Sequence, residues 1–310
     1  MILVPKDKIA DYVARGWWGE QTLGEIFLDT AARQPRQFAV ADPPNRAALW
    51  GTAPQTWSWG ELLAHTGRYA AFLHQQGLRK DDVVVLQLPN CVEMHALYLA
   101  CALSGVIVSP LPMQYRAHEL THVCGATGAR MAITVQRLGQ HESARHWASH
   151  AAQLPSVRAV WALPAGADAP WPEGVGRLDL ALDEVQPWDA AQLRSHMQAI
   201  GLSAHDVLTV CWTSGTEAKP KGVPRNHNEW LIVGQSVIDA GQMQPGCQMV
   251  IPFPFVNMAG VSTSLVAWLL TGGGLRHHHP FDVDVFVGQL RDQPTDYTVA
   301  APAVLSMLLK

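Results

Sequence analysis

A ten-residue stretch, 213–222, gathers the kinds of group that bind phosphate. It contains three hydroxyl side chains, two glycines and two lysines. Hydroxyls and backbone N–H groups can surround phosphate oxygens, and a lysine ammonium neutralises their charge. The stretch does not match a Walker A loop, because Gly222 is not followed by the Lys and Ser or Thr of that pattern. The residues alone leave two interpretations open, a phosphate-binding loop and an ordinary polar turn.

The elements around this stretch alternate between strand and helix. A strand is expected before it (207–212) and a helix after it (229–240). Far upstream, Ser58 and Glu61 form a capping-box pattern that predicts the start of a helix ending near Gly77. A βαβ unit should follow, consisting of strand 83–88, helix 92–103 and strand 106–108.

The same alternation continues to the end of the chain. We expect strands at 131–135 and 157–163 with helix 141–153 between them, a surface loop at 164–174, strand 249–251, helices 261–270 and 283–290, strand 297–300 and a helix start within 303–310. Asp282 and Asp284 favour the helix start after Phe281, because acidic groups interact well with that end of the helix dipole. The pattern predicts an α/β fold with layered parallel sheets flanked by helices.

Composition excludes several functional classes. Among the 310 residues, Lys and Arg number 22 and Asp and Glu 26, which gives a net charge of −4 without a basic block. Nucleic acid is therefore not an expected partner. The longest apolar stretch, 96–108, is interrupted by Ser104 and Gly105 and is shorter than the roughly 20 residues of a membrane span. The five cysteines show no C-x-x-C spacing, and the N-terminus lacks a secretory pattern, so we expect reduced thiols and a cytoplasmic location.

Several segments together carry a resemblance to a known family. The sequence TSGTEAKPKGV (213–223) resembles T-S-G-T-T-G-x-P-K-G-V, the phosphate loop of the AMP-forming acyl-CoA synthetases, or adenylate-forming superfamily. Segment 56–90 resembles the family's opening helix and strand, and segment 96–112 resembles the next helix with its Pro-Leu turn. The motif PFVNMAG (254–260) resembles the family's acyl pocket. The resemblance extends from about residue 20 to the end of the chain.

The resemblance implies a two-step reaction. A carboxylate attacks the α-phosphate of Mg²⁺-bound ATP to give an acyl-adenylate and pyrophosphate, and a thiol, usually coenzyme A, then takes the acyl group. By this resemblance Lys221 is the catalytic residue that neutralises the leaving pyrophosphate. The implied nucleotide-binding residues are Thr213, Ser214, Gly215, Thr216, Glu217, Lys219, Lys221 and Gly222. The implied residues for the acid are His227, Phe255, Val256, Asn257, Met258, Ala259 and Gly260.

Three positions depart from the family pattern. Glu217 and Ala218 stand where the family usually has Thr and Gly. A carboxylate beside polyphosphate is unfavourable, so we expect Glu217 to point away, to pair with a lysine or to bind Mg²⁺. Asn257 stands where the family often has His, and its apolar neighbours indicate an apolar, fatty or aromatic acid. Simple core packing is the alternative for Phe255 and Met258.

The resemblance also predicts how the chain divides. Residues 58–205 should form one α/β subdomain, while the segment 1–57 packs with a second, incomplete subdomain, 206–310. The family's adenine-binding, ribose-binding and hinge segments have no counterpart in this sequence, so we expect the isolated chain to bind ATP weakly at best and not to turn over. Two alternatives stay open: an aryl- or amino-acid adenylation enzyme that loads a carrier protein, and a non-catalytic nucleotide-binding remnant.

Two histidine patterns compete with this interpretation. Residues 118–122 read H-E-x-x-H, which on a helix can bind zinc. The family has a short helix with Glu-Leu at this place, so we expect no metal site. The run 277–279 cannot place three imidazoles on one metal without a turn, because consecutive residues of an extended segment face opposite ways. We expect a solvated loop or strand edge there.

Overall fold

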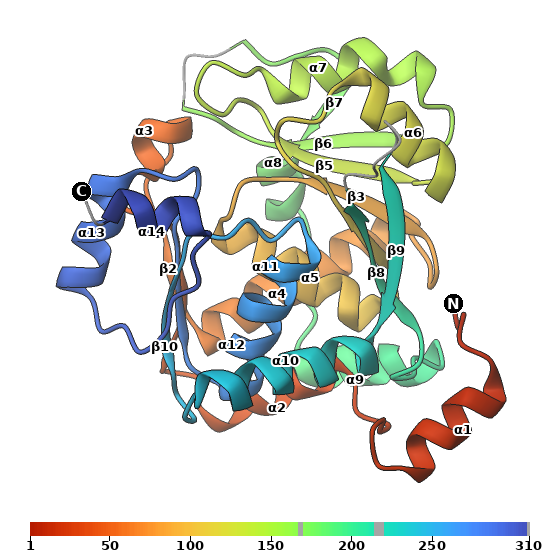
Figure 1. The fold of residues 1–310 in the computed structure, drawn as a ribbon. Coiled ribbons are helices and arrows are strands. Elements are labelled where there is room, and N and C mark those ends of the chain that lie inside the picture. The colour runs from red at the N-terminus through yellow and green to blue at the C-terminus, as the bar shows by residue number, and fades with distance from the viewer. Residues whose placement is uncertain (167–169, 214–219, 309–310) are drawn as a thin grey trace.

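Two β-sheets with helices on their faces form the scaffold (Figure 1). The computed structural model describes residues 1–166, 170–213 and 220–308. The larger sheet has seven strands in the order β7-β6-β5-β3-β4-β8-β9, and the smaller has four in the order β10-β11-β1-β2. The strands are β1 (Phe38–Ala41), β2 (Thr56–Ser58), β3 (Val83–Gln87), β4 (Ile107–Pro110), β5 (Met131–Val135), β6 (Ala159–Leu163), β7 (Val175–Arg177), β8 (Val207–Thr213), β9 (Lys221–Asn226), β10 (Gln248–Ile251) and β11 (Gly274–His277).

Most neighbouring strands run parallel, and the helices are the crossovers between them. Two antiparallel pairs occur among the described strands, β1 with β2 and β8 with β9. The helices are α1 (Lys6–Ala14), α2 (Leu23–Arg33), α3 (Arg46–Trp50), α4 (Trp59–Gln75), α5 (Val92–Ser104), α6 (Ala117–Thr127), α7 (Ser143–His150), α8 (Leu178–Asp183), α9 (Ala190–Ala199), α10 (His227–Gly241), α11 (Met258–Gly260), α12 (Ala267–Thr271), α13 (Val283–Asp292) and α14 (Pro302–Leu308). A 3₁₀ turn (Ala151–Gln153) extends α7, and a π-helical segment (Val261–Val266) joins α11 to α12.

Helix α5 is the centre of the core. All 13 of its residues are buried, which fits its apolar sequence without a polar face. It packs against α2, α4, α9 and β4. The main apolar cluster runs from α2, α4 and α5 through both sheets, and a second cluster lies under α6 and α7. The described part of the chain includes no helix long and apolar enough to cross a membrane.

The predicted α/β class is confirmed, and so are most of the elements. Helix α4 begins at Ser58, whose hydroxyl and the Glu61 carboxylate form the expected capping box. The predicted βαβ unit is present as β3, α5 and β4, and β4 begins one residue later and ends two residues later than predicted. A strand was expected over 297–300, but only Tyr297 forms an isolated bridge, to Met249.

Strand pairing joins segments that are distant in the sequence. Strands β1 and β2 from the N-terminal segment lie in the small sheet with β10 and β11. Strand β8 pairs in parallel with β4 of the large sheet and buries most of its residues there, and β9 pairs with β8. The predicted division into subdomains 58–205 and 206–310 stays a prediction.

The histidine run was expected in a solvated segment, and that expectation is wrong. His277 ends β11, and both His277 and His278 are fully buried. His278 is bonded to Gln289 of α13 through its Nδ1 atom at 2.7 Å. The apolar core encloses the run because β11 is a central strand, with β10 on one side and β1 on the other.

Candidate functional site

The predicted phosphate loop starts at the end of β8 and returns as β9. Thr213 and Lys221 are cross-strand partners, and the Thr213 hydroxyl donates to the Lys221 carbonyl oxygen at 3.5 Å. Ser214, Gly215, Thr216, Glu217, Ala218 and Lys219 lie outside the described residues. The two ends of the loop therefore meet in one antiparallel pair, and the Lys221 residue there is exposed.

Gly222 permits close packing at this pair. A Cβ atom at this position would lie 2.9 Å from Cγ1 of Val210 and 3.2 Å from the Trp212 ring. Trp212 is in turn fixed by a hydrogen bond of 2.9 Å from its indole Nε1 to the Ser109 hydroxyl on β4. The end of the loop is thus tied to the middle of the large sheet.

Helix α6 supports the same loop from outside the sheet. The Nε2 atom of His122 lies 2.8 Å from the carbonyl oxygen of Pro220, and its ring makes an edge contact with Trp212 at 5.8 Å. Glu119 accepts a hydrogen bond from the Arg116 backbone at the start of α6. The H-E-x-x-H residues thus support a loop and cap a helix, and among residues placed by the structure no group of three His, Cys, Asp or Glu could hold a metal ion.

The predicted acid-binding motif (254–260) includes buried residues and more accessible ones. Phe255 and Val256 are buried in the core. Asn257 is the N-cap of α11, and its Oδ1 atom accepts from the Gly260 backbone at 2.8 Å. Met258 is half-buried and Ala259 is exposed. The side chains free to meet a ligand therefore lie in the second half of the motif.

His227 lies at the first position of α10, where it is fully buried. Its Nδ1 atom accepts a hydrogen bond of 3.2 Å from the Leu23 backbone at the start of α2. Burial lowers the pKa of His227 to about 4, so the ring is neutral at pH 7. The structure thus gives His227 a contact that ties α10 to α2, and its predicted role toward the acid stays a prediction.

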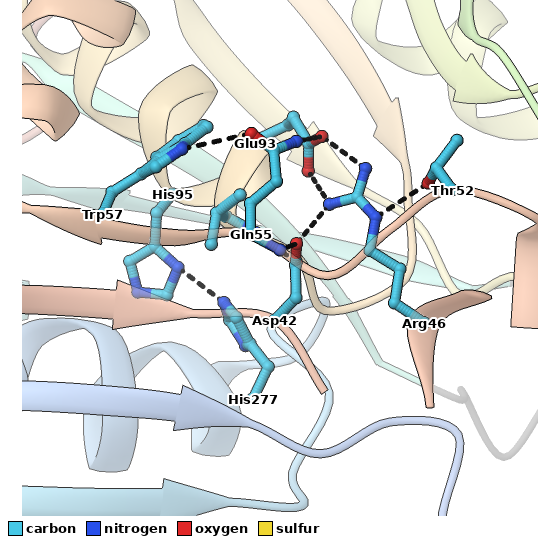
Figure 2. A network of polar contacts seen from close by, with 9 residues as sticks. Asp42, Arg46, Thr52, Gln55, Trp57, Glu93, His95 and His277 are labelled. Carbon is cyan, nitrogen blue, oxygen red and sulfur yellow. Dashed lines mark hydrogen bonds and ion pairs between the residues drawn. The ribbon is translucent and has the colours of Figure 1, made fainter. Parts of the chain in front are cut away.

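A buried charged network around Arg46 was missed by the sequence analysis (Figure 2). Arg46 bonds Glu93 through two nitrogen atoms, at 2.6 and 2.9 Å, and also contacts Asp42 and the Thr52 hydroxyl. Asp42 also accepts from the Gln55 backbone at 2.9 Å. Burial and the Glu93 carboxylate raise the pKa of Asp42 to about 7, against the opposing effect of Arg46.

Figure 2 also shows the imidazoles of His95 and His277 directed toward one another near this network. Glu93 and His95 lie in α5, a helix without a polar face. An ionisable residue in such a helix needs a buried partner. The presence of Glu93 and His95 in this apolar helix could therefore have indicated the network from the sequence. It does not identify the distant residues that are their partners.

Comparison with known proteins adds independent findings. The sequence profile of the family described as AMP-binding enzyme matches residues 29–310. Over 228 residues the chain is 30% identical to a 2-hydroxy-7-methoxy-5-methyl-1-naphthoate–CoA ligase of Streptomyces carzinostaticus, a match that covers 73% of this chain and 38% of the relative. Over 232 residues it is 31% identical to a salicyl-AMP ligase / salicyl-S-ArCP synthetase of Mycobacterium tuberculosis, covering 74% and 37%.

The fold is also found among solved structures. The N-terminal domain of FACL13 from Mycobacterium tuberculosis superposes with a TM-score of 0.74 at 21% identity, and the match covers 94% of this chain and 65% of that one. The present chain spans less than two fifths of the length of either relative above.

Proposed function

Because this chain belongs to the AMP-binding enzyme family, we propose that it serves an enzyme that activates a carboxylic acid with ATP. In the first step the acid's carboxylate attacks the α-phosphate, forming an acyl-adenylate while the bond to pyrophosphate breaks. In the second step the thiol of coenzyme A takes the acyl group and AMP leaves. The chain's own part in this proposal is to hold the polyphosphate and the acid.

The observation that carries the proposal is the pairing of Thr213 with Lys221 at the end of β8. The pairing places both ends of the loop at the carboxyl end of β8, and ligands in α/β folds commonly bind outside the carboxyl ends of the strands. The exposed ammonium of Lys221 suits an anion better than a neutral ligand. We assign it the neutralisation of charge on the leaving pyrophosphate, which lowers the barrier by electrostatic stabilisation.

Among the described residues, no group of three or more His, Cys, Asp or Glu side chains could hold a metal ion. Magnesium binds oxygen ligands and usually keeps several waters while it bridges phosphates. We therefore propose that it enters bound to ATP and offsets phosphate charge there. Hydroxyl and ammonium groups at the loop ends fit the phosphate oxygens that the ion leaves free.

The acid is proposed to be apolar or aromatic. No residue from 253 to 260 carries a charge, so this segment offers no partner for a second charged group on the substrate. Met258 and Ala259 present apolar surface, and the side-chain Oδ1 atom of Asn257 is already used as a helix cap. An acid with an apolar body and one carboxylate matches this lining.

A second candidate differs in the acceptor. The salicyl-S-ArCP synthetase relative is named for transfer to a carrier protein rather than to coenzyme A. We therefore keep acyl transfer to a carrier-protein thiol as the alternative second step. Both candidates share the first step, so one assay tests them together.

The test is acid-dependent exchange of labelled pyrophosphate into ATP. The assay uses the full-length protein as its source organism makes it, with a panel of fatty and aromatic acids. We expect exchange with at least one acid, and its loss by about 100-fold in Lys221→Ala. Lys8→Ala, on the exposed face of α1, is the matched control. Exchange with no acid would leave a nucleotide-binding remnant as the better description. Coenzyme A and a holo carrier protein are then compared as acceptors.

A further inference from the structure

We infer that Asn90 and Tyr98 are positioning residues for the acid-binding segment 253–260, an inference that rests on the proposed function for the identity of the ligand. Asn90 follows β3 of the large sheet and Tyr98 lies in α5. The segment follows β10 of the small sheet. These two side chains therefore fix the acid-binding segment, which follows the small sheet, to the large sheet and its helix α5.

Asn90 makes a two-point contact with the segment's backbone. Its Nδ2 atom donates to the carbonyl oxygen of Phe253 at 2.7 Å, and its Oδ1 atom accepts from the N–H of Phe255 at 3.1 Å. The residue is 1% exposed. A buried amide that uses both its donor and its acceptor fixes direction as well as distance, because displacement of the segment leaves both groups unsatisfied.

Tyr98 completes the contact. Its hydroxyl donates to the carbonyl oxygen of Phe255 at 2.7 Å, and the residue is almost fully buried. Both backbone polar groups of Phe255 are thus bound by side chains from the β3–α5 region. These bonds take the place of strand pairing for a segment that lies beyond the end of β10.

The Phe255 ring is also held in place. It makes edge contacts with His95 at 5.0 Å and 89° and with His277 at 5.1 Å and 74°. Since its backbone and ring are both held, Phe255 is a fixed base from which Asn257, Met258 and Ala259 extend. The position of those three side chains, and hence acid selection, depends on Asn90 and Tyr98.

The chain contains a matched control for Asn90. Asn228 also uses its amide to donate and to accept: its Oδ1 atom accepts from the Gly19 N–H at 2.9 Å, and its Nδ2 atom donates to the Gly19 oxygen at 3.0 Å and to the Ala204 oxygen at 3.3 Å. It is 2% exposed. Asn228→Ala therefore removes an equivalent buried amide without touching the segment.

The first test is amide hydrogen exchange on the 310-residue chain and does not depend on activity. In Asn90→Ala we expect exchange in the peptide covering 253–260 to rise by about tenfold, because the bonds that hold it are lost. Tyr98→Phe, which keeps the ring, should give a smaller rise in exchange of the same peptide. This variant keeps the inference testable if Asn90→Ala does not fold. Asn228→Ala should leave that peptide unchanged. Exchange of 253–260 within twofold of wild type in both Asn90→Ala and Tyr98→Phe would overturn the inference.

The second test is kinetic and uses pyrophosphate exchange by the natural protein. Asn90→Ala should raise KM for the acid by about tenfold and leave KM for ATP unchanged, whereas Asn228→Ala should alter neither. An equal rise in both KM values would overturn the positioning role. If wild type exchanges with no acid, the proposed function fails, and the anchoring of 253–260 is then decided by hydrogen exchange alone.

Discussion

The Nε2 atom of His277 lies 3.0 Å from the Nδ1 atom of His95, so two imidazoles 182 residues apart share a hydrogen bond inside the core. His277 ends β11 of the small sheet, and His95 lies in α5, which follows β3 of the large sheet. Neither residue is exposed. This bond and the contacts of Asn90 with Phe253 and Phe255 join the two sheets beside the segment 253–260 that we propose binds the acid.

Acidification should therefore destabilise the protein. Burial lowers the pKa of His95 to about 3 and that of His227 to about 4, both below the ordinary value of 6.5. The unfolded chain binds protons first, so the stability from each neutral ring is present above pH 6.5 and is lost as pH falls toward the folded-state pKa. At pH 4 the loss is about 3 kcal/mol for each ring.

Urea unfolding at pH 7 and pH 4.5 measures this dependence. We expect the free energy of unfolding to fall between pH 7 and pH 4.5. His118→Gln, at an exposed position of α6, should leave this pH dependence unchanged. A free energy of unfolding that is level between the two pH values would contradict the burial of neutral histidines.

The Arg46 network predicts a large effect from one substitution. Arg46→Met removes the guanidinium that pairs with the buried carboxylates of Asp42 and Glu93. Unfolding free energy should fall by about 3 to 5 kcal/mol. Arg15→Ala breaks an exposed pair with Asp11 and should change it by less than about 1 kcal/mol. Similar losses of unfolding free energy in Arg46→Met and Arg15→Ala would contradict the burial of the Arg46 ion pairs.

How far the sequence predicts this structure depends on the range of the interaction. The capping box at Ser58 and the apolar pattern of β3 are local, and both were predicted correctly. The pairing of His95 with His277 and of Arg46 with Glu93 joins distant segments, which no local pattern identifies. The solvated prediction for 277–279 failed for the same reason, since the burial of that run comes from strands that pair on both sides of β11.

The candidate site is known from the sequence mainly as a prediction. The motif at 213–222 located the loop, and the structure adds that Thr213 and Lys221 pair across it. The support from His122 was not predictable, because its position in an H-E-x-x-H pattern indicated a different chemistry. Roles assigned to the nucleotide-binding residues stay predictions.

Close packing at Gly222 should make this position sensitive to a single methyl group. Gly222→Ala places a Cβ atom 2.9 Å from Val210 Cγ1, and we expect a loss of about 1 to 2 kcal/mol in unfolding free energy. Gly125→Ala in α6 is the control, because its Cβ atom meets nothing within 4 Å and alanine favours a helix. Equal stability of the two variants would contradict the packing of β9 against β8.

Loss of the His122 contact should weaken nucleotide binding without involving zinc. His122→Ala removes the bond to Pro220, and a loss of about 1 kcal/mol corresponds to roughly fivefold weaker binding of Mg²⁺-ATP. His118→Ala, one turn earlier on α6, should bind as wild type does. Titration calorimetry and a zinc determination on the purified protein check both points, and one zinc ion per chain would contradict this account.

The most direct measurement is a crystal structure of the protein soaked with Mg²⁺ and a non-hydrolysable ATP analogue at high concentration. The account predicts phosphate oxygens within hydrogen-bond distance of the Lys221 ammonium and the Thr213 hydroxyl. Triphosphate density at any other place, or none beside β8 and β9, would contradict it.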